Sequence, residues 1–252
     1  RGWQVPPHQQ AMVDRRAEPA VLLIAPTGGG KTMAGFLPTL AELAAGRHEG
    51  LHTLYVSPLK ALAADIKRNL TGPVTEMGLP IRIEDRTGDT SYTRKRRQRA
   101  DPPHILLTTP ESLALMCSYE DAPRIFKGLQ RVIVDEIHAL AESKRGDQLM
   151  LALARLQGLC PGLRRVGLSA TVEDPDAIAQ MLARHPDPCA IVAADPFNPK
   201  ARYYLGLEKA QAGNVRPALQ AWVDLAGLSV ADASWLDAVY RKIAAAKELG
   251  LD

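Results

Sequence analysis

The sequence predicts an α/β protein, with an open, mostly parallel sheet flanked by helices and a small all-helical tail after it. Three observations lead to this prediction. Short apolar runs rich in β-branched residues recur, and each ends at a polar or Gly/Pro-containing cluster, as buried parallel strands do. Helix-like stretches separate the runs. Near residue 195 the pattern changes to small residues at helical spacing.

The predicted strands and helices alternate along the first 194 residues. Strands are expected at residues 21–24, 53–56, 105–108, 131–134 and 166–168. Helices are expected at residues 32–45, 59–69, 147–157 and 176–183. This alternation implies crossover connections and helices on both faces of the sheet. Ligand sites in such sheets lie at the carboxyl ends of the strands, so functional residues are expected there.

Composition restricts the class of protein. The chain has 252 residues, a formal net charge of +3 and no apolar run near the ~20 residues that would span a bilayer, so no membrane segment is expected. It begins with Arg1 and shows no leader, which is typical of an excerpt without a secretory signal. Three widely spaced cysteines suit a reducing, cytoplasmic compartment. Residues 94–99 carry five positive charges, which suit either a polyanion or a solvated helix face.

A glycine-rich segment, residues 25–32, lies between the first predicted strand and helix. Such glycines let backbone N–H groups turn around phosphate oxygens, and the following helix start favours an anion. Lys31 would reach the β and γ phosphates and Thr32 would bind Mg²⁺. The candidate phosphate-binding residues are Thr27, Gly28, Gly29, Gly30, Lys31 and Thr32. Ala25 stands where the strict pattern has glycine, and a glycine-rich turn that binds nothing is the alternative.

Two carboxylates follow the fourth predicted strand. Asp135 would hold Mg²⁺ and Glu136 would polarise the attacking water, so these two and Lys31 are the candidate catalytic residues. An exposed acidic turn is the alternative. His138 is interpreted as a link from this acidic segment to Ser169 and Thr171, which follow the next strand; the alternative for these two hydroxyls is a helix cap.

Together these segments resemble a family. Residues 25–32, 135–138 and 169–171 resemble motifs I, II and III of superfamily 2 helicases. Other segments look like the intervening motifs that follow a nucleic-acid backbone; their candidate residues are Ser57, Pro58, Leu59, Lys60, Thr87, Gly88, Asp89, Thr109, Pro110 and Glu111. Trp3, residues 7–9, 57–69, 135–140 and 144–146 look most like the Lhr-type group, nearest the bacterial DNA-ligase-associated DEXH-box helicases.

The resemblance implies a RecA-like lobe over residues 3–194 that binds ATP with Mg²⁺, with Gln9 recognising adenine. It also implies binding of single-stranded DNA or RNA without sequence preference, translocation 3′ to 5′ and a role in DNA repair. Lys60 or Arg86 would grip phosphates. Taken alone, residues 108–111 also suit a plain helix start. Such motors close ATP between two lobes, and only the first is found here, so weak binding, slow hydrolysis and no unwinding are expected.

The segment 195–252 is expected to form a separate helical tail. Leu205, Gly206, Gly213, Ala218 and Trp222 occupy the relative positions of a tetratricopeptide unit, and residues 198–232 resemble that region of a c-type cytochrome biogenesis protein. Since these parent families occupy different compartments, we infer that two unrelated pieces meet near residues 194–197.

Two alternative functions stay open at this point. The chain suits a P-loop ATPase or kinase without a nucleic-acid role, although the strand-end segments speak against it. It also suits an interaction module in which the tail binds an extended peptide and the P-loop domain is a relic.

Overall fold

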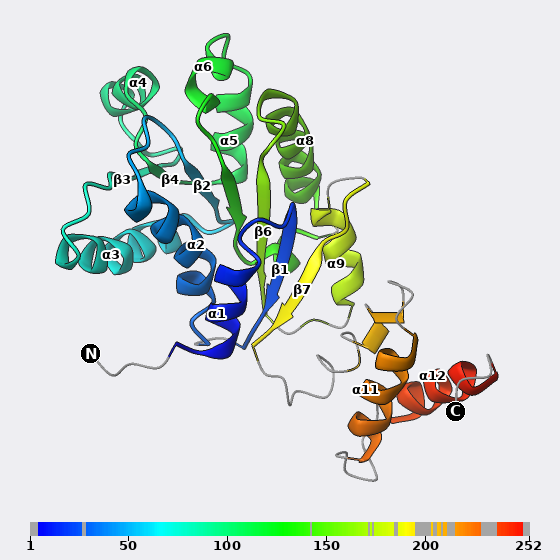
Figure 1. Ribbon diagram of the computed structural model, residues 1–252. Helices are drawn as coiled ribbons and strands as arrows, with labels where there is room; N and C mark the ends of the chain where they lie inside the picture. Colours follow the sequence, from blue (N-terminus) through cyan, green and yellow to red (C-terminus); the bar gives the residue numbers. More distant parts are fainter. Residues whose placement is uncertain are drawn as a thin grey trace.

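The computed structural model describes residues 5–26, 29–141, 143–170, 172, 174–183 and 186–194, and in the tail 203, 206–207, 209–210, 215–227 and 236–248. Its first part is an α/β unit and its tail is helical (Figure 1). Residues 195–202, around the inferred junction, lie outside the described residues. No helix in the described ranges is both long and apolar enough to span a membrane.

A seven-stranded sheet forms the centre of the α/β unit, in the order β3-β4-β2-β5-β6-β1-β7, and all neighbouring strands run parallel. Its strands are β1 (Ala20–Ile24), β2 (Thr53–Val56), β3 (Ile83–Arg86), β4 (Ile105–Thr108), β5 (Arg131–Val134), β6 (Arg164–Ser169) and β7 (Ala190–Ala193). The predicted fold class is therefore confirmed. The two strands that the sequence did not predict, β3 and β7, are the edge strands. An edge strand is only half buried and does not need a continuous apolar run.

Helices cover both faces of the sheet (Figure 1). They are α1 (Pro7–Asp14), α2 (Lys31–Ala45), α3 (Lys60–Glu76), α4 (Tyr92–Ala100), α5 (Pro110–Cys117), α6 (Ala122–Phe126), α7 (Ile137–Leu140), α8 (Lys144–Leu159) and α9 (Pro175–Leu182). Alternate strand residues enter two separate cores. Leu54, Val132 and Val134 join the core under α5 to α9, whereas Tyr55 and Ile133 join the core under α1 to α3.

Helix boundaries follow local caps. The helix predicted at 147–157 begins earlier, at Lys144, because the Ser143 hydroxyl accepts a hydrogen bond from the Gly146 N–H at 3.1 Å. The helix predicted at 59–69 continues to Glu76, through Pro73. The predicted helix at 32–45 matches α2, which begins at Lys31.

The described tail consists mainly of α11 (Val215–Gly227) and α12 (Leu236–Glu248). Ala218, Trp222 and Val239 are buried in a small core of their own. The indole of Trp222 donates a hydrogen bond to the Tyr203 carbonyl at 3.0 Å, and a Cβ on Gly206 would overlap the same ring. A small residue thus faces a bulky one, as helix-hairpin packing requires. The tetratricopeptide class stays a prediction, and Leu205 and Gly213 lie outside the described residues.

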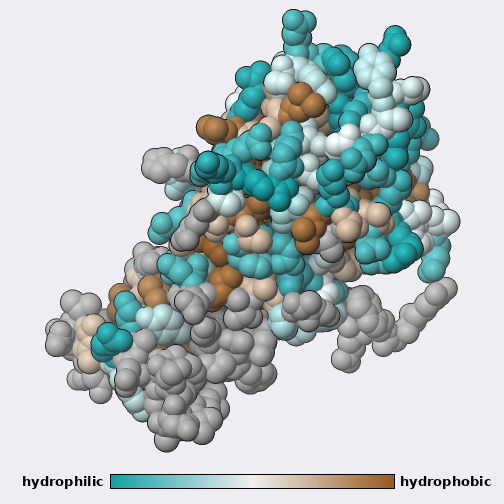
Figure 2. Space-filling view, turned by 180° about the vertical axis from the view of Figure 1, so that it is seen from behind, coloured by the Kyte–Doolittle hydropathy of each residue, from teal (hydrophilic) through white to brown (hydrophobic). Residues whose placement is uncertain are grey.

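Seen from behind, the described surface of the molecule is mainly hydrophilic, with hydrophobic residues in small groups (Figure 2). All three cysteines are free: Cys117 and Cys160 are buried and Cys189 is half-buried. Burial raises the pKa of the Cys117 thiol to about 11, which makes it a poor nucleophile at neutral pH. No chemistry is assigned to these thiols.

Candidate functional site

The glycine-rich segment connects β1 to α2 at the carboxyl edge of the sheet. Gly30 has φ 72°, in the left-handed region, and a Cβ there would lie 2.9 Å from the Gln9 amide nitrogen. A Cβ on Gly29 would lie 3.0 Å from the Pro26 carbonyl oxygen. Both positions therefore favour glycine, for backbone conformation and for space. Thr27 and Gly28 lie outside the described residues.

Lys31 is buried in this segment. Its ammonium donates hydrogen bonds to the carbonyl oxygens of Ala25 at 3.0 Å and Pro26 at 3.3 Å. A lysine held by two neutral carbonyls can exchange them for phosphate oxygens, with which a charge-assisted hydrogen bond is stronger. Thr32, the next residue, lines the cavity described below.

Gln9 and His8, on α1, are buried beside Gly30. The Gln9 carbonyl oxygen and His8 Nε2 have no hydrogen-bond partner among the described residues. A buried polar atom left unsatisfied costs about 1–3 kcal/mol. Two such atoms beside a phosphate-type loop suit a polar ligand. His8 was not among the site residues predicted from the sequence.

Asp135 follows β5 and is buried, with 4 % of its surface exposed. One carboxylate oxygen accepts the Glu136 N–H at 2.8 Å, and the other accepts the Tyr55 hydroxyl. Burial raises the pKa of Asp135 above its usual value. Tyr55 gave no signal in the sequence, where it is one apolar residue of a strand.

Glu136 has φ 49°, the sole positive φ of a non-glycine residue in the described part of the chain. Such a conformation is uncommon for glutamate and concentrates at functional sites. The turn directs the Glu136 carboxylate to His138 Nε2 at 3.2 Å. Two carboxylates adjacent in sequence thus acquire different environments, since Asp135 is buried and Glu136 is partly exposed.

His138 connects the acidic turn to the end of β6. Its Nδ1 atom lies 3.2 Å from the Ser169 hydroxyl and accepts the Ala170 N–H at 3.4 Å. With Nδ1 accepting, the neutral ring carries its proton on Nε2 and can donate it to Glu136. The structure therefore brings Glu136, His138 and Ser169 into one chain of contacts, while Thr171 lies outside the described residues.

A cavity of about 460 Å³ joins these residues. Its lining residues are Gly30, Lys31, Thr32, Met33, Asp65, Ile66, Asn69, Leu70, Asp135 and Glu136. The phosphate-type loop and the acidic turn, about a hundred residues apart in sequence, thus face one space. Asp65 and Asn69 come from α3 and were not candidates, because an exposed polar residue on a helix carries no distinctive signal.

The residues around this cavity offer few metal ligands of their own. No group of three or more His, Cys, Asp or Glu in the described ranges could hold a metal ion by itself. Mg²⁺, however, keeps several waters and needs only one or two protein ligands together with phosphate oxygens. Thr32 and Asp135, which both line the cavity, fit that requirement.

The candidate nucleic-acid residues lie at the carboxyl ends of β2, β3 and β4. Lys60 and Asp89, from two of these segments, form an exposed ion pair at 3.1 Å. Arg145, which was not a candidate, donates to the Pro58 carbonyl at 3.0 Å and to Glu111 at 2.5 Å. The three segments are therefore brought together on one edge: Ser57, Pro58, Leu59 and Lys60, then Thr87, Gly88 and Asp89, then Thr109, Pro110 and Glu111.

Local structure also explains part of these motifs. The Thr109 hydroxyl caps α5, Pro110 opens the helix and Glu111 lies in its first turn, as a plain helix start requires. Arg86 is not free to grip a phosphate, contrary to one expectation. It is buried and donates to the Lys95 carbonyl and the Tyr119 hydroxyl. Of the two expected cations, Lys60 alone is exposed.

The basic run 94–99 lies on α4, and three of its five basic side chains form ion pairs within the fold. Arg94 pairs with Asp85 at 2.8 Å, Arg97 pairs with Glu84, and Arg99 pairs with Asp121 at 2.7 Å. The solvated helix face is thus the better interpretation.

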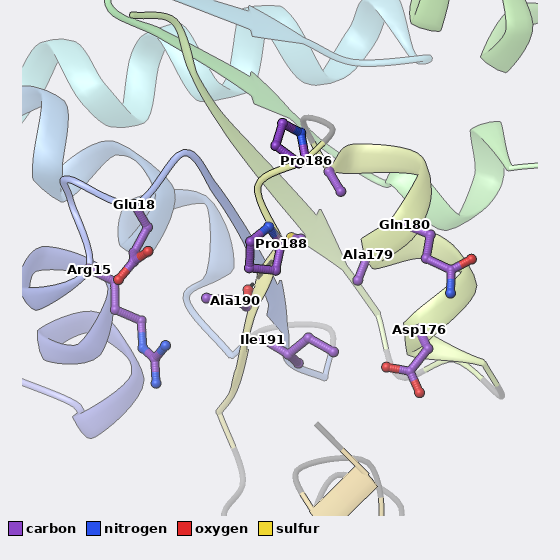
Figure 3. Close-up of a pocket in the computed structure, with 11 residues that line it drawn as sticks. Arg15, Glu18, Asp176, Ala179, Gln180, Pro186, Pro188, Ala190 and Ile191 are labelled. Atoms are coloured by element: carbon purple, nitrogen blue, oxygen red, sulfur yellow. Dashed lines mark hydrogen bonds between the residues drawn. The ribbon is translucent and has the colours of Figure 1, made fainter. Parts of the chain in front are cut away.

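A second cavity, of about 610 Å³, lies between α1, α9 and β7 (Figure 3). Arg15 and Glu18 line one side, and Asp176 and Gln180 line the other (Figure 3). None of the sequence-predicted site residues lines it.

Comparison with known proteins places the chain among helicases. The DEAD/DEAH box helicase family matches residues 6–178. The chain is 44% identical over 196 residues to the ATP-dependent helicase Lhr-Core protein 2 of Thermococcus barophilus, covering 72% of this chain and 23% of that protein. It is 47% identical over 176 residues to the Lhr helicase/probable uracil glycosylase of Mycolicibacterium smegmatis, covering 64% and 12%. The chain thus spans a quarter or less of these relatives.

Solved structures agree with this placement. The helicase Lhr of Mycobacterium smegmatis, bound to ssDNA and AMP-PNP, superposes with a TM-score of 0.68 and 41% identity over 75% of this chain and 26% of that one. The DEAD-box helicase Mss116, bound to ssRNA and UDP-BeF, has a TM-score of 0.66 at 18% identity, over 82% of this chain and 47% of that one, and shows the fold alone.

Proposed function

The chain belongs to the DEAD/DEAH box helicase family, and from this premise we propose that it is the first RecA-like lobe of an Lhr-type ATP-dependent DNA helicase. The observation that carries the proposal is that Lys31, Thr32, Asp135 and Glu136 line the same cavity. A phosphate-binding lysine and a pair of carboxylates facing one space can bind and hydrolyse a nucleoside triphosphate.

The nucleotide would be ATP, held at both ends. Gln9, with an unpartnered carbonyl oxygen beside Gly30, would accept a hydrogen bond from the adenine amino group. The backbone around Gly29 and Gly30 would surround the phosphates, with Thr27 and Gly28 completing the loop. Lys31 would leave the Ala25 and Pro26 carbonyls for the β and γ phosphates.

Mg²⁺, when bound, neutralises charge on the phosphates. Thr32 and Asp135 would hold it, Asp135 directly or through water. Glu136 would orient the attacking water for displacement at the γ phosphate. His138 and Ser169, with Thr171, would report the state of Glu136 to the strand end that follows β6.

The nucleic-acid partner would be single-stranded DNA, or RNA, bound through its backbone. Lys60 is exposed and Thr87, Gly88 and Asp89 lie beside it. Phosphate contacts of this kind position a strand without reading its bases. The Lhr structure that resembles this chain was determined with ssDNA and AMP-PNP, which supports both ligands.

Hydrolysis by this lobe alone is expected to be slow. No arginine is among the residues that line the cavity in the described part of the chain. In related NTPases, an arginine finger contributes about 10³ to 10⁵ in rate, and in superfamily 2 motors the second lobe supplies it. We therefore propose that unwinding requires a second lobe. A role in DNA repair rests on the family resemblance, and a cytoplasmic location rests on the three widely spaced cysteines.

Equilibrium binding of a fluorescent ATP analogue with Mg²⁺, with and without single-stranded DNA, tests the proposal. Binding by the wild-type chain that is strengthened by DNA and lost in Lys31→Ala is expected. Lys127→Ala, an exposed lysine distant in sequence from the loop, is the matched control and should bind like wild type. Absence of binding by the wild type would contradict the proposal, and binding without any DNA effect would favour an ATPase or kinase with no nucleic-acid role.

The tail carries a second candidate function. α11 and α12 pack through Trp222, Leu225 and Val239 as a helical pair, which supports a tetratricopeptide-like segment able to bind an extended peptide. Retention of a peptide library by the whole chain, lost in Trp222→Ala and kept in Lys31→Ala, would favour this function.

A further inference from the structure

We propose that Tyr55 is a positioning residue that holds the Asp135 carboxylate in the orientation needed for the metal. The inference rests on the proposed function, since it concerns the same site. It adds a residue from β2, a strand that contributes no residue to the cavity lining.

The position of Tyr55 on β2 allows its hydroxyl to reach the Asp135 carboxylate. Tyr55 pairs with Ile133 in the register of β2 and β5, so Asp135 lies two residues farther along. Two residues of strand span ~6.6 Å, a distance that a phenol ring and its hydroxyl can bridge. Because side chains alternate between faces, Tyr55, Ile133 and Asp135 share one face of the sheet. The hydroxyl accordingly reaches the carboxylate.

The Asp135 carboxylate is fixed at both oxygens. The Glu136 N–H binds one oxygen at 2.8 Å and the Tyr55 hydroxyl binds the other. Two donors on different oxygens prevent rotation of the carboxylate about its last bond. One lone pair on each oxygen stays available for a metal-bound water or a metal ion.

The Tyr55 ring is itself fixed. It is fully buried and stacks on Phe36, with ring centroids 5.4 Å apart and an angle of 25° between the planes. Phe36 lies on α2, the helix that begins at Lys31. The hydroxyl is therefore held by the same helix that carries the phosphate-binding lysine, so Asp135 and Lys31 share one rigid support.

The Tyr55 hydroxyl donates its hydrogen to Asp135, so it supports a proposed metal ligand without touching the cavity itself. Metal ligands commonly depend on such supporting hydrogen bonds, whose removal lowers metal affinity about 10- to 100-fold.

Tyr55→Phe tests the proposal, because it removes the hydroxyl and leaves the ring on Phe36. Two quantities would be measured on the whole chain: binding of a fluorescent ATP analogue without metal, and the Mg²⁺ concentration that gives half of the metal-dependent increase in that binding. Mn²⁺ binding in the presence of AMP-PNP, followed by electron paramagnetic resonance, gives a readout independent of hydrolysis. We expect unchanged metal-free nucleotide binding and a metal requirement raised about 10-fold or more.

Tyr119→Phe is the matched control. It also removes a tyrosine hydroxyl, but one that accepts a hydrogen bond from Arg86, at 3.0 Å, and does not contact Asp135. Its metal requirement should equal that of wild type. In an Asp135→Asn background, Tyr55→Phe should add no further loss of metal affinity, because the partner is already altered.

Four outcomes separate the possibilities. A metal requirement equal to wild type in Tyr55→Phe would overturn the inference, and so would a lowered melting temperature with unchanged metal affinity, which marks a purely structural role. Equal losses in Tyr55→Phe and Tyr119→Phe would also overturn it. A wild-type chain that binds no nucleotide would contradict the proposed function itself.

Discussion

The Nδ1 atom of His138 lies 3.2 Å from the Ser169 hydroxyl, although 31 residues separate them in sequence. On its other side, the His138 ring contacts the carboxylate of Glu136. A side chain between the proposed water-orienting acid and the end of the next strand is placed to transmit a change from one to the other.

His138→Ala is therefore expected to uncouple the two ligands. DNA should no longer strengthen binding of the ATP analogue, whereas affinity for the nucleotide alone should change less than about threefold, because His138 does not line the cavity. Binding titrations with and without DNA measure both. Retained DNA stimulation would contradict the proposed link. His104→Ala is the control, because His104 lies before β4, at the amino ends of the strands. In this variant DNA should still strengthen binding of the ATP analogue.

Lys60→Ala should weaken single-stranded DNA binding uniformly across sequences. Loss of one phosphate contact lowers the slope of log affinity against log salt by about 1. Asp89→Asn should act in the opposite direction, since it frees Lys60 from its ion pair and removes a negative charge from the same edge. Fluorescence anisotropy over a series of salt concentrations distinguishes the two. Equal effects of both substitutions would argue against a phosphate contact by Lys60.

Gly30→Ala should abolish nucleotide binding while the chain stays folded. A Cβ at φ 72° is strained and would lie 2.9 Å from the Gln9 amide nitrogen. Gly46→Ala is the matched control, because that glycine has an ordinary extended backbone and nothing within 4 Å of an added Cβ. Circular dichroism confirms folding and the fluorescent analogue measures binding. Normal binding by Gly30→Ala would show that the loop does not contact phosphate.

Glu42→Gln should destabilise the chain by about 3–5 kcal/mol, since it leaves the buried Arg131 without its charged partner. Glu42 also pairs with Arg164 at 2.7 Å. Urea unfolding measures the loss. Glu76→Gln, at an exposed glutamate, should lie within about 0.5 kcal/mol of wild type. A similarly small effect of Glu42→Gln would show that this cluster contributes little.

Stability should fall with acidification in two stages. Burial lowers the pKa of His52 below its usual value, so the unfolded chain binds a proton first and stability falls as pH drops below about 6.5. Burial alone would raise the pKa of Glu42, but hydrogen bonds from His52, Arg131 and Arg164 hold it well below the usual range. That contribution is present above about pH 4.5 and is lost as pH falls further.

Urea midpoints between pH 3 and pH 8 check this profile. His52→Gln should reduce the loss of stability between pH 7 and pH 5 and leave the loss below about pH 4.5 unchanged. A midpoint that does not change between pH 7 and pH 5 in the wild type would contradict the assignment to His52.

The central strands and the phosphate-type loop were predictable because each is encoded by neighbouring residues. Residues 131–134 are apolar enough to predict a buried strand, and a glycine-rich segment before a helix is recognisable without its partners. The edge strand Ile83–Arg86 was missed because half of it faces polar surroundings. Arg86 was expected to grip a phosphate, yet it is buried and donates to Tyr119.

The sequence alone determined the order of elements, the strand-end positions of the candidate residues and the local glycine requirement, since these depend on periodicity and backbone conformation within a few residues. The tertiary structure decided which side chains meet. Tyr55 reaches Asp135 and His138 reaches Ser169 because β2, β5 and β6 are neighbours in the sheet. Lys60 pairs with Asp89 because the segments after β2 and β3 meet beyond the end of β4, which lies between these strands. Hydrogen bonds and ion pairs act over a few ångströms in space, and no spacing along the chain specifies those distances.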